Sequence, residues 1–208
     1  TNDVIKTSTG DLMTSLQAKL SEAGTAEKAK IWYPIAQNVE GYTNPLSKYI
    51  QDLKDEILKE AGADYSKQDS TYDEGELNIA TRLMVKQGKG KELLKRLTEF
   101  KNNLLGIGGD SLRSEIEKLI QINLEKPKSL TGDKRKSWEE SYFHMVPSVA
   151  ALTILSKFQN DVKTTENKVI TFCHEQVGKV VFRFNQYEPI VGQNSKVLLP
   201  NQELEITA

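Results

Sequence analysis

The sequence of 208 residues has very little of what many functional sites are built from. It holds one cysteine, Cys173, which excludes an internal disulfide framework and a thiolate metal cluster. It holds two histidines, and aromatic residues make up only 7% of the chain. No hydrophobic run reaches the roughly 18 residues of a membrane-spanning helix, and no signal-peptide pattern is present. The sequence therefore predicts no membrane-spanning segment within this chain.

An excess of charge of one sign is also missing. The chain has 28 basic and 29 acidic residues, so its formal charge of -1 gives no bulk attraction to nucleic acid or to an anionic membrane. The two locally basic segments, 89–101 and 125–136, contain a single aromatic residue, Phe100, on which a base could stack. We interpret both segments as solvated loops or helix faces in preference to a nucleic-acid footprint.

Apolar residues at helical spacing fill most of the chain. A first stripe over 12–20 ends before Gly24, and a second covers 26–61. Pro34 and Pro45 fall inside the second stripe, and each removes a helical hydrogen bond. The pattern therefore predicts either one kinked helix over 26–61 or two helices placed end to end.

A polar connection and a short helix follow this long stripe. The segment 64–76 has five acidic residues against one lysine and almost no aliphatic residues, which is typical of a solvated loop. The spacing over 77–85 then indicates a short helix, broken by the glycines of 87–91.

The next two stripes predict a helical hairpin. Leucines and a phenylalanine recur over 93–105, and a second stripe covers 112–122. The glycines of 106–109 separate them, and Asp110 or Ser111 can cap the second helix. We expect two antiparallel helices joined by this glycine turn.

The longest periodic signal begins at Pro147, a residue well suited to the first position of a helix. Apolar residues then advance by alternating threes and fours, which indicates a core-facing seam on a helix of roughly 30 residues, or about 45 Å. The seam consists of Val149, Leu152, Leu155, Phe158, Val162, Thr165, Val169, Phe172 or Cys173, and Val177.

After Gly178 the period changes to that of strands. Val180, Phe182 and Phe184 alternate with other residues, as do Leu204 and Ile206. Roughly 30 residues cannot enclose a core of their own, since about 40 is already the lower limit for unaided domains.

The predicted fold class is therefore mainly α: a helical bundle over 1–178 with a long C-terminal helix, followed over 179–208 by the first strands of an incomplete β-rich domain. Because the chain starts at Thr1 and ends on an open strand pattern, we expect it to be an excised fragment.

The sequence contains only incomplete versions of known metal-binding and catalytic motifs. His174 and Glu175 begin like a zinc-protease helix, but position 178 is glycine where the second histidine would stand. His144 and His174 have no thiolate partners, so a structural or surface role is favoured for both. Adjacent helical residues point about 100° apart, so Cys173 cannot be activated by His174, and we interpret it as a small apolar residue in the seam.

Phosphate-binding and proton-transfer patterns are equally weak. The glycines and lysines of 88–91 lack the spacing of a phosphate loop, and no strand precedes them. Glu139 and Glu140 are adjacent acids with no sign of pairing that would suit them for proton transfer. The sequence thus predicts no catalytic, cofactor-binding or metal-binding residue, and no cofactor.

One segment carries a specific resemblance. Residues 142–165, YFHMVPSVAALTILSKFQNDVKTT, resemble the periplasmic part of the GldM/PorM family, the inner-membrane motor-stalk proteins of type IX secretion and gliding motility. The family's pattern has an aromatic lead, a proline that enters a long helix, a Gln-Asn-Asp-Val-Lys run and a following β-rich domain. Here these are Tyr142 with Phe143, Pro147, Gln159 to Lys163, and Val180 onward. Residues 12–16 and 49–54 fit the family more loosely.

The resemblance implies an architecture and a set of partners. Family members have four tandem periplasmic domains, the first α-helical and the later ones immunoglobulin-like, and they form homodimers. They are anchored in the inner membrane by an N-terminal helix that this chain lacks. The implied partners are the inner-membrane protein GldL/PorL and the outer-membrane-associated ring components GldK/GldN or PorK/PorN.

The expected function is that of a non-enzymatic periplasmic stalk that transmits energy from a proton-driven motor, with a static helical adaptor as the alternative. Two local expectations accompany it. The polar run Gln159 to Asp161 faces solvent or is satisfied by neighbouring helix ends, with a partner-contact patch as the alternative. Phe143, Met145 and Val146 pack across a helix end.

Overall fold

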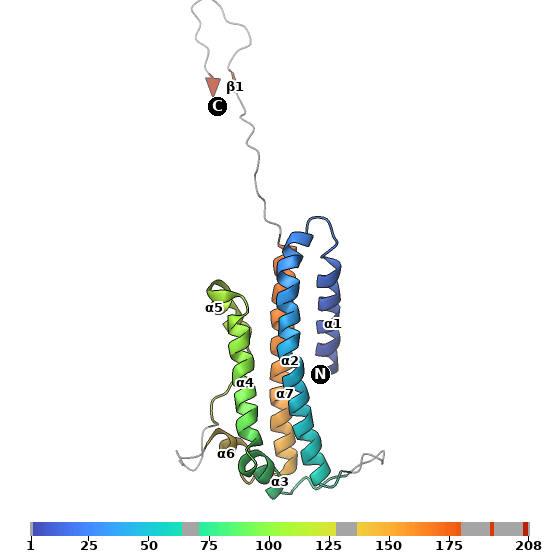
Figure 1. Ribbon diagram of the computed structural model, residues 1–208, viewed down its shortest axis with the longest axis vertical. Coiled ribbons are helices and arrows are strands. Elements are labelled where there is room, and N and C mark those ends of the chain that lie inside the picture. The colour runs from blue at the N-terminus through green and yellow to red at the C-terminus, as the bar shows by residue number, and fades with distance from the viewer. Residues whose placement is uncertain (1, 64–70, 128–136, 180–191, 194–205, 208) are drawn as a thin grey trace, which may run out of the picture. The chain divides into compact units, whose positions relative to one another are not determined.

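The structure is a computed structural model that describes residues 2–63, 71–127, 137–179, 192–193 and 206–207 (Figure 1). The chain divides into two compact units, Thr1–Gly178 and Lys179–Ala208. The helices and strands, in chain order, are α1 (Asn2–Ala18), α2 (Ala26–Glu60), α3 (Asn78–Ala80), the π-helix η1 (Thr81–Lys86), α4 (Lys89–Gly106), α5 (Gly109–Leu119), α6 (Trp138–Phe143), α7 (Ser148–Gly178), β1 (Gly192–Gln193) and β2 (Ile206–Thr207).

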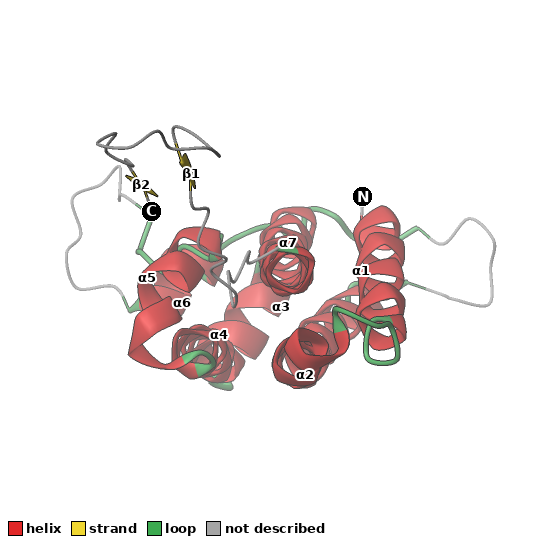
Figure 2. Ribbon diagram, turned by 90° about the horizontal axis from the view of Figure 1, so that it is seen from above, coloured by secondary structure: helices red, strands yellow, loops and turns green. Residues whose placement is uncertain are grey.

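The first unit is built around two long helices, α2 and α7, which lie side by side and run in opposite directions (Figure 1). In the view along the bundle, α1 covers one side of this pair and α4, α5 and α6 lie on the other (Figure 2). The mainly helical class predicted from the sequence is confirmed.

The α2 helix is a single helix of 35 residues, which decides between the two alternatives that its prolines left open. Its buried positions advance by threes and fours from Ala36 to Ile57, so one continuous face packs into the core. Pro34 and Pro45 both lie on the exposed face, where water can bond the carbonyl groups that each proline leaves without a partner. The interruption of the hydrogen-bond ladder is therefore confined to the solvent side.

The predicted seam of α7 is confirmed over most of its length. From Leu155 to Val177 the expected positions are buried, and Cys173 occupies the position for which Phe172 was the alternative. The beginning of the seam was wrong: Val149 is exposed and Ala151 is buried. Three hydrogen bonds from Ser148 and Val149, together with a tight corner before them, set the rotation of the first turn. Apolar spacing carries no information about such contacts.

The short helices around α4 depend on close backbone packing. α3 and η1 together form the short helix predicted near 77–85, and Gly88, with φ of 76°, turns the chain into α4. Gly90 lies against α6 and η1: a Cβ atom there would stand 2.6 Å from Glu139 Cβ and 2.7 Å from the Met84 carbonyl oxygen. Glycine at position 90 therefore allows three elements to meet.

The starts of α6 and α5 differ in their local hydrogen bonds. α6 begins with a capping box in which Ser137 Oγ accepts from the Glu140 amide (3.3 Å) and Glu140 Oε2 accepts from the Ser137 amide (2.8 Å). α5 starts earlier than predicted: its N-cap is Gly108, without a side-chain bond, so neither Asp110 nor Ser111 caps it.

In the second unit, the structure describes two short antiparallel strands, with Gly192 opposite Thr207 and Gln193 opposite Ile206. The predicted alternation at Val180, Phe182, Phe184 and Leu204 lies outside the described residues. The assignment of 179–208 to the start of a β-sandwich stays a prediction.

The close packing at Gly90 gives a first test. We expect Gly90→Ala to lower the free energy of unfolding by about 1–3 kcal/mol, because the added methyl group overlaps Glu139 and Met84. The matched control is Gly41→Ala on the exposed face of α2, where nothing lies within 4 Å of the new Cβ. The control should gain about 0.5–1 kcal/mol, because alanine is the better helix former. Urea denaturation followed by circular dichroism measures both, and equal effects would contradict the packing described.

Candidate coupling element

The structural feature that dominates the first unit is α7, a helix of 31 residues that is about 46 Å long. It packs along α2 over most of that length and also contacts α1, α3, α5 and α6. It ends at Gly178, the last residue of the first unit. The contacts that position it fall into three zones: its start, its middle and its end.

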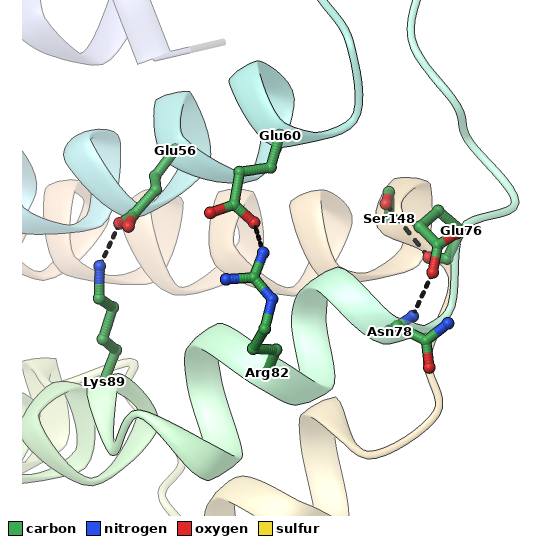
Figure 3. A network of polar contacts seen from close by, with 7 residues as sticks. All are labelled: Glu56, Glu60, Glu76, Asn78, Arg82, Lys89 and Ser148. Carbon is green, nitrogen blue, oxygen red and sulfur yellow. Dashed lines mark hydrogen bonds and ion pairs between the residues drawn. The ribbon is translucent and has the colours of Figure 1, made fainter.

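At its start, α7 is fixed by the segment that precedes α3. The Ser148 amide (3.0 Å) and hydroxyl (3.2 Å) both donate to the carbonyl oxygen of Glu76 (Figure 3). The Val149 amide donates to the carbonyl oxygen of Glu74 (3.2 Å). The first amides of a helix have no partner within the helix, so these bonds cap it from a distant segment. Nearby, Arg82 pairs with Glu60 and Lys89 with Glu56, which ties η1 and α4 to the end of α2 (Figure 3).

The corner between α6 and α7 is held by one hydroxyl group. Thr81 Oγ1 accepts a hydrogen bond from the Met145 amide (2.7 Å), and it lies 3.2 and 3.3 Å from the carbonyl oxygens of Leu77 and Phe143. Met145 has a φ angle of 53°, which lies in the left-handed region that residues other than glycine rarely adopt. The chain therefore turns sharply here before Pro147.

The expectation for the residues before Pro147 was partly wrong. Phe143 is fully buried and Val146 is half-buried, but Met145 is exposed. The physical reason is the left-handed backbone at Met145, which turns the chain so that this side chain stays on the outside of the corner.

In the middle of α7, the polar run predicted to face solvent or a helix end contacts the flank of α2. Gln159 Nε2 donates to Gln51 Oε1 (3.2 Å) and lies 3.5 Å from the Ser47 carbonyl oxygen, while its Oε1 accepts from Lys54 Nζ (3.2 Å). Asp161, on the same run, pairs with Lys157 at 2.6 Å. Gln159 thus bonds to three residues of α2. Its polar atoms find their partners along the side of α2 and not at a helix end.

Further along, α7 buries a carboxylate. Glu166 is 2% exposed and pairs with Lys163 Nζ at 3.0 Å. Burial raises the pKa of Glu166, and Lys163 offsets only part of this effect; Glu40 raises the pKa further, whereas the Thr43 hydroxyl lowers it. The charged form is therefore less favourable inside the fold than in water.

Near its end, α7 is joined to α1. His174 Nε2 lies 2.9 Å from Ser15 Oγ, and Asn167 Nδ2 donates to Thr9 Oγ1 (3.1 Å). Burial, followed by the charge of Lys19, lowers the pKa of His174, and Glu175 acts in the opposite direction. An open groove of about 740 Å³ runs beside this contact, lined by Val4, Thr7, Ser8, Asp11, Leu12, Ser15 and His174.

The residues that the sequence analysis considered for catalysis lie in separate parts of the first unit. His144 precedes α7 and His174 lies near its far end, so the helix keeps them apart. Cys173 is buried and burial raises its pKa to about 12, which keeps the thiol protonated. Glu140 caps α6, while Glu139 is buried 3.8 Å from Lys91 Nζ, a burial that sequence spacing could not reveal. Within the part of the chain that the structure describes, no group of three or more metal-ligating side chains gathers.

These contacts define a structural class: a helical domain in which one long helix is bonded at its start, middle and end to its neighbours. None of the helices that the structure describes is long and apolar enough to cross a membrane.

Comparison with known families gives the identification. The family model of the GldM N-terminal domain matches residues 1–175, and the chain belongs to this family. The protein is therefore involved in gliding motility and type IX secretion, and the family consists of periplasmic proteins anchored in the inner membrane. A comparison with curated proteins finds no match.

The buried carboxylate gives the second test, which compares the chain with its Glu166→Gln variant. Because the folded state raises the pKa of Glu166, it holds the proton more tightly than the unfolded chain does. The contribution of this group to stability is therefore fully present below the ordinary pKa of 4.5 and decreases as pH rises through the window above it. Glutamine does not titrate, so we expect the unfolding free energy of the parent, minus that of the variant, to fall between pH 4 and pH 8.

Urea denaturation at several pH values measures this difference. Glu115→Gln, at an exposed position of α5, serves as the control for loss of a carboxylate. A difference that rises with pH would show that Lys163 outweighs burial and would contradict the assignment.

Proposed function

We propose that this domain is a non-enzymatic part of a periplasmic stalk that transmits energy from an inner-membrane, proton-driven motor for type IX secretion and gliding. The single observation that carries the proposal is the bonding of α7 along its whole length. The Glu76 carbonyl group holds its start, Gln159 joins its middle to α2, and His174 joins its end to α1. A helix held in this way moves with the bundle as one body.

Stiffness is the physical requirement for transmission. An α-helix satisfies its backbone hydrogen bonds internally, and α7 adds to this a buried face from Leu155 to Val177. Bending it would expose that face, and each fully buried aliphatic side chain contributes about 1.5–3 kcal/mol. Because α7 ends at Gly178, the last residue of the first unit, a displacement of the bundle would act on the chain at this point.

The proposal includes the partners that family membership suggests. The domain acts in a homodimer, receives motion from GldL or PorL in the inner membrane, and passes it toward the outer-membrane-associated GldK/GldN or PorK/PorN ring. The rival function is a static adaptor that docks the same partners without conveying motion. The two differ in one respect, namely whether the mechanical continuity after Gly178 matters.

This difference can be tested by insertions between Gly178 and Lys179 in the full-length protein. A flexible Gly/Ser segment of about seven residues should interrupt transmission, because such linkers behave as random coils. A helix-forming Ala/Glu/Lys segment of the same length is the matched control, since about seven residues nearly complete two helical turns and preserve the orientation. Co-purification with GldL or PorL measures docking, and secretion into the medium measures function.

We expect both insertions to keep docking, whereas the flexible one lowers secretion about tenfold and the helical one lowers it less. Normal secretion with the flexible segment would favour the adaptor. Loss of co-purification in both variants would show that the insertion disturbs assembly. A loss of secretion would then reflect failed assembly and would support neither the transmitting stalk nor the static adaptor.

A further inference from the structure

The end of the bundle where α3 meets the start of α7 exposes apolar surface. Six large hydrophobic side chains are exposed among the described residues, and three of them lie here: Leu77 (37%), Met145 (51%) and Val149 (40%). Hydrogen bonds bring them together, because Thr81 Oγ1 bonds to the Met145 amide and lies 3.2 Å from the Leu77 carbonyl oxygen. The Val149 amide bonds to the carbonyl group of Glu74, three residues before Leu77. We call these three side chains the α7-entry patch.

The backbone at this patch is strained. A left-handed conformation at a residue with a side chain costs on the order of 1–2 kcal/mol, and glycine at position 145 would avoid that cost. Thr81, which holds the corner, is also the first residue of the π-helix η1. Strained residues and π-turns are concentrated at functional sites. The fold thus holds a methionine outward at a cost in stability, and methionine suits adaptable binding surfaces.

The rim of the patch is acidic. Asp73 and Glu74 are exposed and Glu76 is half-buried, all within four residues of Leu77. Asp73 and Glu76 accept hydrogen bonds from the amides of Gly75 (3.0 Å) and Asn78 (2.7 Å). The ion pairs among the described residues include none of these three acids. Because Asp73 and Glu74 are exposed, their negative charge can attract a cation from outside.

We propose that the α7-entry patch docks a segment of a partner protein that presents aliphatic side chains flanked by lysine or arginine. The three apolar side chains supply the contact area, and the acidic rim supplies charge complementarity, which governs specificity and the rate of association. The same rim would face the phosphates of an anionic bilayer and repel them. The proposal can be tested separately from the proposed function of α7, because peptide binding is measured on the isolated chain and transmission is measured by secretion.

The test uses the 208-residue chain with ¹³C-labelled methyl groups of methionine, leucine and valine. An amphipathic peptide of leucine and lysine is the probe, and a leucine and glutamate peptide of equal length and spacing is its control. We expect the lysine peptide to shift the methyl signals of Leu77, Met145 and Val149 in a saturable way, and to bind about tenfold more tightly than the glutamate peptide. Equal affinity for the two peptides, or shifts as large at the remote Val4, would overturn the proposal.

Matched variants separate charge from apolar contact. Glu74→Lys reverses a charge at a side chain with no hydrogen bond to maintain, and it should weaken binding about tenfold, whereas Glu115→Lys on α5 should leave it unchanged. Met145→Gln should weaken binding at nearly constant side-chain length. If that variant fails to fold, Val149→Thr tests the same contact at a regular helical position. Retained affinity in Glu74→Lys would contradict the proposed chemistry.

Two further measurements identify the competing occupants. Phosphatidylcholine vesicles with a quarter phosphatidylglycerol should leave the three methyl signals unmoved, and shifts there would assign the patch to a membrane surface. Dilution of the chain without peptide should also leave them unmoved, and concentration-dependent shifts would assign the patch to a second copy. Either outcome would replace the proposal.

Discussion

The packing of α7 against α2 is the interaction on which the rest of the first unit depends. Both helices present buried positions at alternating steps of three and four, so the two faces remain in register over many turns. The strength of this contact explains why α2 continues through Pro34 and Pro45. Each proline costs about 3 kcal/mol in a helix interior. The buried aliphatic residues of α2 contribute about 1.5–3 kcal/mol each, and the face includes Val39, Leu46, Ile50, Leu53 and Ile57.

Polar groups inside this packing define its register. Thr165 is fully buried, donates to the Asp161 carbonyl oxygen (2.8 Å) and accepts from the Gln121 amide (3.0 Å), which joins the segment after α5 to α7. Glu166 and Gln159 face α2 at two other levels. A buried polar group that loses its partner costs about 1–3 kcal/mol, so sliding α7 by one turn would be penalised at Thr165 and Glu166. It would also break the contacts that the half-buried Gln159 makes with α2. Apolar residues supply the attraction, and these polar residues select one alignment.

Much of this fold could be predicted from the sequence because its main signal is periodic. The seam from Leu155 to Val177 and the stripe of α2 follow from spacing alone, and the segment 142–165 was specific enough to indicate the family. What spacing could not reveal depends on contacts between distant segments. Gly90 was interpreted as one of the glycines that break the short helix over 77–85, although it permits a close approach to Glu139. Phe143 and Met145 are both apolar and two residues apart, yet Phe143 is buried and Met145 is exposed. The left-handed backbone at Met145 and the hydrogen bond that its amide donates to Thr81 Oγ1 set this difference.

The start of α7 and its apolar seam are held by different kinds of contact, which has a mechanical consequence. Along the seam, displacement exposes many apolar side chains at once, so resistance is distributed. At the start, the helix is held mainly by hydrogen bonds from Ser148, Val149 and Met145, each with a net value of about 0.5–1.5 kcal/mol. Met145 also stores backbone strain that an opening of the corner would release. Under load along α7, the corner beside Thr81 would therefore yield before the seam, and a partner bound at the α7-entry patch would stabilise the weakest point of the helix.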